Sequence, residues 1–198
     1  MARPKSYNRE EVVERVVYAF WQHGYQALGL RELERLTGLN QFAIRTEFGG
    51  KEGLYLEALD VYSEKAIDHA MQPMKDGGIQ DIIDFLYALV TDGSMTSSKH
   101  GCLVVNTGIE NARGGSPRLV KAVRRYWHEL ENCFLTCLEN AAASKRIDPS
   151  TDCASLAKGL VSGVMGVHVQ HRLDGSNRGG RFLVGVLCDQ LGAMERDA

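Results

Sequence analysis

Apolar side chains recur three and four residues apart along most of this chain, the spacing of helices that bury one face. In the first such segment the apolar positions are Val12, Val13, Val16, Val17, Phe20 and Trp21. Strand-like alternation is almost absent, so the pattern predicts an all-α fold of about nine helices. The expected helices cover residues 9–23, 30–37, 41–47, 51–69, 79–91, 102–112, 117–143, 152–171 and 181–194.

Residues that favour helix ends stand at several of these boundaries. Asn8, followed three residues later by Glu11, is typical of an N-terminal capping box, and Gly24 is suited to end the helix that follows. Asn40 and Ser116 are expected N-caps, the latter directly before Pro117.

Composition places the chain among cytoplasmic globular proteins. Of its 198 residues 44% are apolar and 24% charged, and no apolar run approaches the ~18 residues that span a bilayer. No apolar stretch typical of a signal peptide follows the first residues. The five cysteines contain no C-x-x-C pair, which argues against a zinc knuckle or a disulfide framework. We therefore expect no membrane contact, metal or cofactor.

The charge is unevenly distributed. Residues 1–51 contain eight basic and six acidic side chains, a net of +2, so the remainder of this −2 chain carries −4. The asymmetry mildly favours a polyanionic partner for the N-terminal part. Together with a change from short to long helices, it predicts a domain boundary near residue 50, giving domains of residues 1–50 and 51–198.

The three short N-terminal helices, with Gly38 between the second and third, match a helix-turn-helix pattern. A major groove admits one helix, whose N-terminal residues reach base edges while the preceding helix braces it.

Four segments make this more specific: Gly24-Tyr25, Leu30 to Leu33, Gly38 to Asn40, and Phe48 to Leu54. Their order and spacing resemble the N-terminal domain of the tetracycline-repressor (TetR) family. The resemblance implies a homodimeric repressor of a palindromic DNA operator, released when a small-molecule inducer binds the C-terminal domain. The DNA-contacting residues it implies are Arg31, Asn40, Gln41, Arg45, Thr46 and Lys51.

The chain departs from the family pattern in the third helix. Arg45 and Glu47 stand where the family often has phosphate-contacting aromatics. Glu47 is a solvated acid, the partner of a nearby base, or a sign of different DNA contacts. Phe42, Ile44 and Phe48 are expected in the core of the three-helix unit, whereas Arg3, Lys5 and Arg9 are candidates for a basic arm.

For the C-terminal part we expect a ligand pocket among the fifth to eighth helices and a dimer interface on the last two. The pocket candidates are Phe85, Leu89, Leu103, Asn106, Trp127, Phe134, Met165 and His168. The interface candidates are Leu156, Leu160, Gly163, Val167, Leu183, Val186, Leu187 and Leu191. Three glycines inside the eighth helix favour a close helix–helix approach, because each costs about 1 kcal/mol relative to Ala.

Two alternatives concern Cys102, which lies in a GCL-x-x-N segment similar to that of some family members. Near a helix start and after Lys99 and His100, its thiol is a small packing group or a reactive redox sensor of lowered pKa. The alternative from another class is a small helical enzyme or carrier, with Cys102 and His100 or His128 as nucleophile and base. No motif supplies a third, orienting group, so we expect no catalytic residues.

Overall fold

The computed structural model describes residues 7–94 and 96–196, and over these ranges the chain forms nine α-helices and no strand. The all-α prediction is confirmed. The helices are α1 (Arg9–His23), α2 (Leu30–Thr37), α3 (Gln41–Glu47), α4 (Lys51–Ala66), α5 (Ile79–Ala88), α6 (Leu103–Glu110), α7 (Pro117–Ala143), α8 (Cys153–Asp174) and α9 (Arg181–Met194).

Several helix ends differ from the sequence expectation. The fourth helix was expected to reach residue 69, but α4 ends at Ala66 and continues as a π-helical turn and then a 3-10 turn that contains Pro73. Proline lacks the backbone N–H that an α-helix needs at that point. Helix α8, in contrast, is longer than predicted and ends three residues later, at Asp174. Gly175 follows as its C-cap in the left-handed conformation, at φ +61°.

The helix starts follow the predicted caps. The Asn40 side chain accepts a hydrogen bond from the Ala43 N–H at 2.8 Å, and Asn8 accepts from the Glu10 N–H at 3.0 Å. Ser116 caps α7 in the same way. These bonds satisfy backbone donors that a helix start leaves unpaired.

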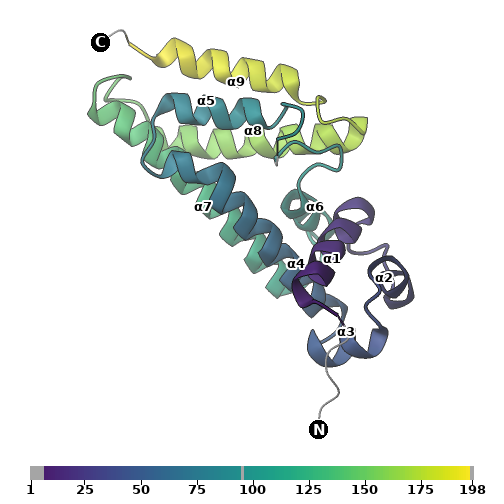
Figure 1. The fold of residues 1–198 in the computed structure, drawn as a ribbon. Coiled ribbons are helices and arrows are strands. Elements are labelled where there is room, and N and C mark those ends of the chain that lie inside the picture. The colour runs from purple at the N-terminus through teal and green to yellow at the C-terminus, as the bar shows by residue number, and fades with distance from the viewer. Residues whose placement is uncertain (1–6, 95, 197–198) are drawn as a thin grey trace.

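The helices form an elongated molecule with two ends (Figure 1). Helices α1, α2 and α3 gather at one end, α5, α8 and α9 at the other, and α4 and α7 run side by side between them. A single apolar core connects the two ends. Among the described residues, no helix is both long and apolar enough to cross a membrane.

Tyr55 of α4 contacts both α1 and α6. Its ring packs against Phe20 of α1 and against Tyr25, with ring centroids 4.5 and 4.7 Å apart. Its hydroxyl lies 2.7 Å from Thr107 Oγ1 on α6. Because Thr107 donates its own proton to the Leu103 carbonyl, Tyr55 must be the donor. Tyr55 therefore ties α4 to α1 and α6.

Two of the three α8 glycines provide the predicted close approach, and they do so within one chain. A Cβ on Gly163 would lie 2.7 Å from Leu187 Cδ1, and one on Gly166 would lie 3.3 Å from Leu183 Cδ2. Both leucines belong to α9. Gly159 has no such neighbour within 4 Å.

Candidate nucleic-acid interface and ligand pocket

The turn between α2 and α3 fixes which face of α3 points outward. Gly38 adopts φ +75°, and Leu39 behind it is buried. Helix α3 then packs Ala43 and Ile44 inward. The outward face therefore consists of Phe42, Arg45 and Thr46, which are spaced i, i+3 and i+4.

Phe42 corrects one prediction. It was expected in the core with Ile44 and Phe48, but its side chain is 76% exposed, while the other two are buried. Residues two positions apart in a helix are separated by about 200° around its axis, so Phe42 and Ile44 lie on opposite faces. An exposed phenyl ring thus stands in the middle of the face that a groove would meet.

Three predicted contact residues already have hydrogen-bond partners. Asn40 uses its side-chain oxygen as the α3 cap, and Gln41 donates from Nε2 to Glu34 Oε2 at 2.7 Å. Thr46 donates to the Phe42 carbonyl at 2.9 Å and remains exposed, as do Arg31 and Arg45.

Lys51 is the first residue of α4. Its Nζ lies 4.5 Å from the centroid of the Tyr25 ring, and the partial burial lowers the pKa of the ammonium group. Gly49 and Gly50 precede it at φ +72° and +96°, conformations that glycine adopts most readily. Lys51 thus belongs to the first turn of α4, where a helix start offers backbone N–H groups to an anion.

Glu47 pairs with the start of the chain's first helix. The Tyr7 hydroxyl donates to Glu47 Oε2 at 2.7 Å, and Arg9 Nη1 lies 3.9 Å from the same oxygen. Burial, followed by this hydrogen bond, raises the pKa of Tyr7 to about 12. Arg9 also holds Glu57 of α4 through two bonds of 2.8 and 2.6 Å. Pairing with a basic neighbour is therefore the observed role of Glu47, whereas Arg3 and Lys5 lie outside the described residues.

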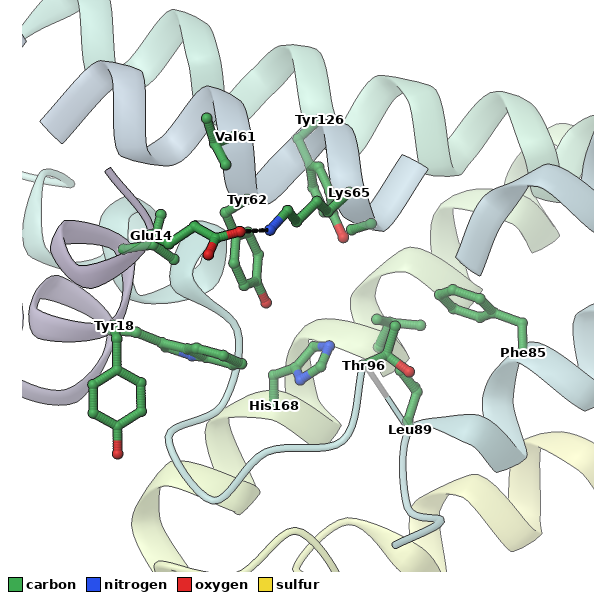
Figure 2. A pocket seen from close by; sticks show the side chains of 14 residues that line it. Glu14, Tyr18, Val61, Tyr62, Lys65, Phe85, Leu89, Thr96, Tyr126 and His168 are labelled. Atoms are coloured by element: carbon green, nitrogen blue, oxygen red, sulfur yellow. Dashed lines mark hydrogen bonds and ion pairs between the residues drawn. The ribbon is translucent and has the colours of Figure 1, made fainter. Parts of the chain in front are cut away.

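A cavity of about 320 Å³ opens between the two ends of the molecule (Figure 2). Its walls come from α1, α4, α5, α7 and α8, with Thr96 from the segment between α5 and α6. Of the predicted pocket residues, Phe85, Leu89 and His168 line it.

The remaining pocket candidates lie outside this lining. Leu103 and Phe134 are fully buried in the core, and Trp127 and Met165 pack against other parts of it. The Asn106 amide donates to the His100 carbonyl at 3.1 Å. Sequence reasoning missed the α1 and α4 walls, which include Trp21 and Tyr62, because it expected a pocket among the fifth to eighth helices only.

The cavity carries no unpaired charge among its lining residues. Glu14 and Lys65 form an ion pair of 2.5 Å between α1 and α4. His168 is buried, which lowers its pKa to about 3 and keeps the imidazole neutral. Burial raises the pKa of Tyr62 and of Tyr126, so both phenols are neutral as well.

The predicted interface residues divide into two groups. Leu160, Val167 and Leu191 are buried inside the chain, because they form the contact of α8 and α9 with the other helices. The prediction that these three residues lie on the dimer interface is therefore corrected, since their side chains are covered within one chain. Leu183 and Val186 are exposed, Leu156, Gly163 and Leu187 are half-buried, and Leu173 and Phe182, which were not predicted, are exposed by 75% and 73%.

Residues 79–183, more than half of the chain, match the family model described as the tetracyclin repressor-like C-terminal domain. The chain belongs to the tetracycline-repressor family.

Relatives extend the match to the N-terminal helices. The chain is 27% identical over 175 residues to the HTH-type transcriptional repressor ComR of Escherichia coli K12, covering 86% of this chain and 82% of ComR. A TetR transcriptional regulator from Chloroflexus aurantiacus superposes with a TM-score of 0.81, at 24% identity and 96% coverage of both chains. A cysteine mutant of CifR bound to double-stranded operator DNA superposes at 0.78, with 22% identity and coverage of 98% and 100%. This TetR-family protein is a DNA-binding transcriptional regulator and not an enzyme.

The environment of Cys102 is that of a packing residue. The residue is 1% exposed, and burial raises the pKa of its thiol. Hydrogen bonds from the α6 backbone and from Tyr62 lower this pKa, but they offset the effect of burial only in part. A reactive cysteine needs access and a lowered pKa, so the geometry contradicts the lowered pKa expected from sequence. The described residues contain no group of three or more His, Cys, Asp or Glu side chains placed to hold a metal ion.

Proposed function

We propose that this TetR-family protein is a cytoplasmic homodimeric repressor that binds a palindromic operator through α3 and is released by a small-molecule inducer. Residues 1–50 would form the DNA-binding domain and residues 51–198 the ligand-binding and dimerisation domain. The observation that carries the proposal is the outward face of α3, which presents an arginine, a threonine and an exposed phenyl ring together.

Each side chain on that face suits a different feature of the major groove. Arg45 can donate two hydrogen bonds from its guanidinium group to O6 and N7 of a guanine, and the Phe42 ring suits contact with a thymine methyl group. Thr46 and Gln41 lie beside them as polar contacts. Arg31 on α2 and Lys51 on α4 flank the helix and suit phosphates. Asn40 contributes mainly by fixing the start of α3.

The exposed apolar side chains at the end of α8 and along α9 support the dimer. Leu173, Phe182, Leu183 and Val186 are exposed apolar side chains, here called the nonpolar strip. They belong to α8 and α9, which lie at the end of the molecule away from α3 (Figure 1). A second copy that covers this strip would place two α3 helices on one DNA face. Successive major-groove faces lie about 34–36 Å apart, which is why a two-fold dimer pairs with a palindromic site.

The GCL-x-x-N segment has a structural role in this proposal. The Trp21 indole N–H donates to the Gly101 carbonyl at 2.9 Å, and Arg172 Nη1 donates to the Trp21 carbonyl at 3.1 Å. A Cβ on Gly101 would lie 2.6 Å from the His168 carbonyl. We therefore assign the segment as the junction of α1 and α8, and an oxidation switch at Cys102 is the disfavoured alternative.

Footprinting on DNA upstream of the protein's own gene tests the repressor proposal. We expect protection of a palindromic segment that weakens as salt rises. Arg45→Ala should abolish the footprint, whereas Arg124→Ala, a matched exposed arginine on α7, should preserve it. Equal footprints from both variants would remove α3 as the reading helix.

The dimer is tested separately by Val186→Glu. Val186 is 57% exposed, so the charge should not disturb the fold of one chain. We expect the variant to sediment as a monomer and to lose operator affinity, while Gln190→Glu on the same helix keeps both properties. A dimeric Val186→Glu protein would contradict the assigned strip.

A further inference from the structure

The size, the lining side chains and the charges of the cavity between α1, α4 and α8 restrict the chemical class of ligand that it can bind. It is small, about 320 Å³, near the lower end of the roughly 300–1,000 Å³ typical of ligand pockets. Its lining also includes one buried histidine, His168, whose neutral imidazole can donate or accept a hydrogen bond.

His168 is aimed into the cavity. Figure 2 shows its imidazole reaching from α8 toward Tyr62 of α4, and both side chains line the cavity. The side chain is only 5% exposed and its Nδ1 is fully covered, so a molecule in the cavity meets the part of the imidazole that lines it. The neighbouring His171 is also buried but does not line the cavity.

The walls favour a flat aromatic ligand. Trp21, Tyr62, Phe85 and Tyr126 approach the cavity from four different helices. Aromatic rings prefer offset-stacked or edge-to-face contacts with other rings, and this arrangement offers both around a planar molecule.

The charges favour a neutral ligand. Glu14 and Lys65, the charged groups in the lining, already pair with each other at 2.5 Å. A charged ligand would lose its hydration without gaining an unpaired counter-charge, which is unfavourable in an apolar site.

We propose that this cavity binds a small neutral aromatic molecule with one hydrogen-bonding group, which the His168 imidazole anchors while the aromatic ring of the ligand lies against Trp21 and Tyr62. The inference rests on the proposed inducer-released repressor and specifies its inducer. The ligand touches α1 directly, because Glu14, Tyr18 and Trp21 belong to the same wall. Its entry therefore acts on the helix that carries the DNA-binding unit.

Four naphthalene probes of matched shape test the ligand class by calorimetric titration at pH 7. They are 2-naphthol, 2-methylnaphthalene, 2-naphthoate and 2-naphthylmethylammonium. We expect 2-naphthol to bind at least tenfold more tightly than each of the others, because it alone is neutral and hydrogen-bonding. Failure of 2-naphthol to bind, or tighter binding of either ion, would overturn the proposal without any variant.

Variants then test the anchor. In His168→Phe the preference for 2-naphthol over 2-methylnaphthalene should fall to about one, and His168→Asn should restore part of it. His171→Phe, a buried histidine on the same helix, should retain the full preference. An unchanged preference in His168→Phe would overturn the role of the His168 imidazole.

Operator binding by the same preparations separates the two proposals. A wild-type protein that binds its operator but does not discriminate between the probes contradicts only the ligand assignment. A protein that binds no operator contradicts the repressor itself. If 2-naphthol binds selectively, it should also weaken operator affinity, and unchanged affinity would contradict the action on α1.

Discussion

Replacing Lys51 by glutamine gives a quantitative test of the DNA-binding geometry. Lys51 places its ammonium at the start of α4, held 4.5 Å from the Tyr25 ring centroid, where one phosphate can meet both the charge and the helix N-terminus. Each neutralised phosphate contributes about −0.9 to the slope of log K against log salt concentration. A dimer that loses two such contacts should therefore have a slope shallower by about 1.8.

This slope difference has a measurable size. Over a fourfold salt range, such as 50 to 200 mM, it makes the affinity advantage of the wild type about tenfold larger at the low-salt end. The cost to folding should be small, since an exposed cation–π contact contributes about 0.5–1 kcal/mol. Fluorescence anisotropy with a labelled operator measures the affinities, and circular dichroism checks the fold.

Lys65→Gln is the matched control. Lys65 lies on the same helix, about 21 Å further along at 1.5 Å per residue, and pairs with Glu14. That distance exceeds the Debye length of about 10 Å at 0.1 M salt, so the control should keep the wild-type slope. An unchanged slope in Lys51→Gln, or equal changes in both variants, would refute the phosphate assignment.

Three further predictions follow from individual side chains. Phe42→Ala should leave the free energy of unfolding within about 0.5 kcal/mol of wild type, as measured by urea denaturation. Operator affinity should fall, and discrimination at one T·A pair should decrease by no more than the roughly 1–3 kcal/mol that a mismatched base pair costs, as measured by binding to substituted operators. With Ellman's reagent the native protein should react at half-buried Cys153 before buried Cys102, and mass spectrometry that finds Cys102 labelled first would restore the redox alternative. His168 is neutral in the folded protein down to about pH 3, but in the unfolded chain it protonates near pH 6.5. The free energy of unfolding should therefore fall as pH drops from 6.5 toward 3, by about 1.4 kcal/mol per pH unit. Denaturation at pH 7 and pH 5 measures this loss, and His168→Phe should show a smaller difference between the two pH values.

Local sequence was sufficient for the helices and several of their ends. A cap such as Asn40 acts on a backbone N–H three residues away, and helical periodicity depends on neighbours within one turn. The family motif around Gly38 and Lys51 was readable for the same reason, since its spacing is continuous in the chain. Where a helix end was missed, as at Asp174, the cause was still local, the left-handed glycine that follows.

The candidate site depended on contacts between distant segments. Helix α3 has only seven residues, too few for periodicity to decide that Phe42 faces outward, and packing of Ile44 on the core decides it. Glu47 is paired through residues 7 and 9, about forty positions away in sequence. No local pattern encodes either arrangement.

The same distinction explains the C-terminal part. Sequence identified α8 and α9 as apolar helices, but only packing shows that Leu160 and Val167 are buried in the chain while Val186 is exposed. The cavity needs walls from five helices, so its lining is a property of their relative positions. Amphipathic spacing determined which residues are apolar enough to be buried, and the tertiary structure decided which neighbour, groove or ligand each face meets, because helix packing joins residues that the sequence separates.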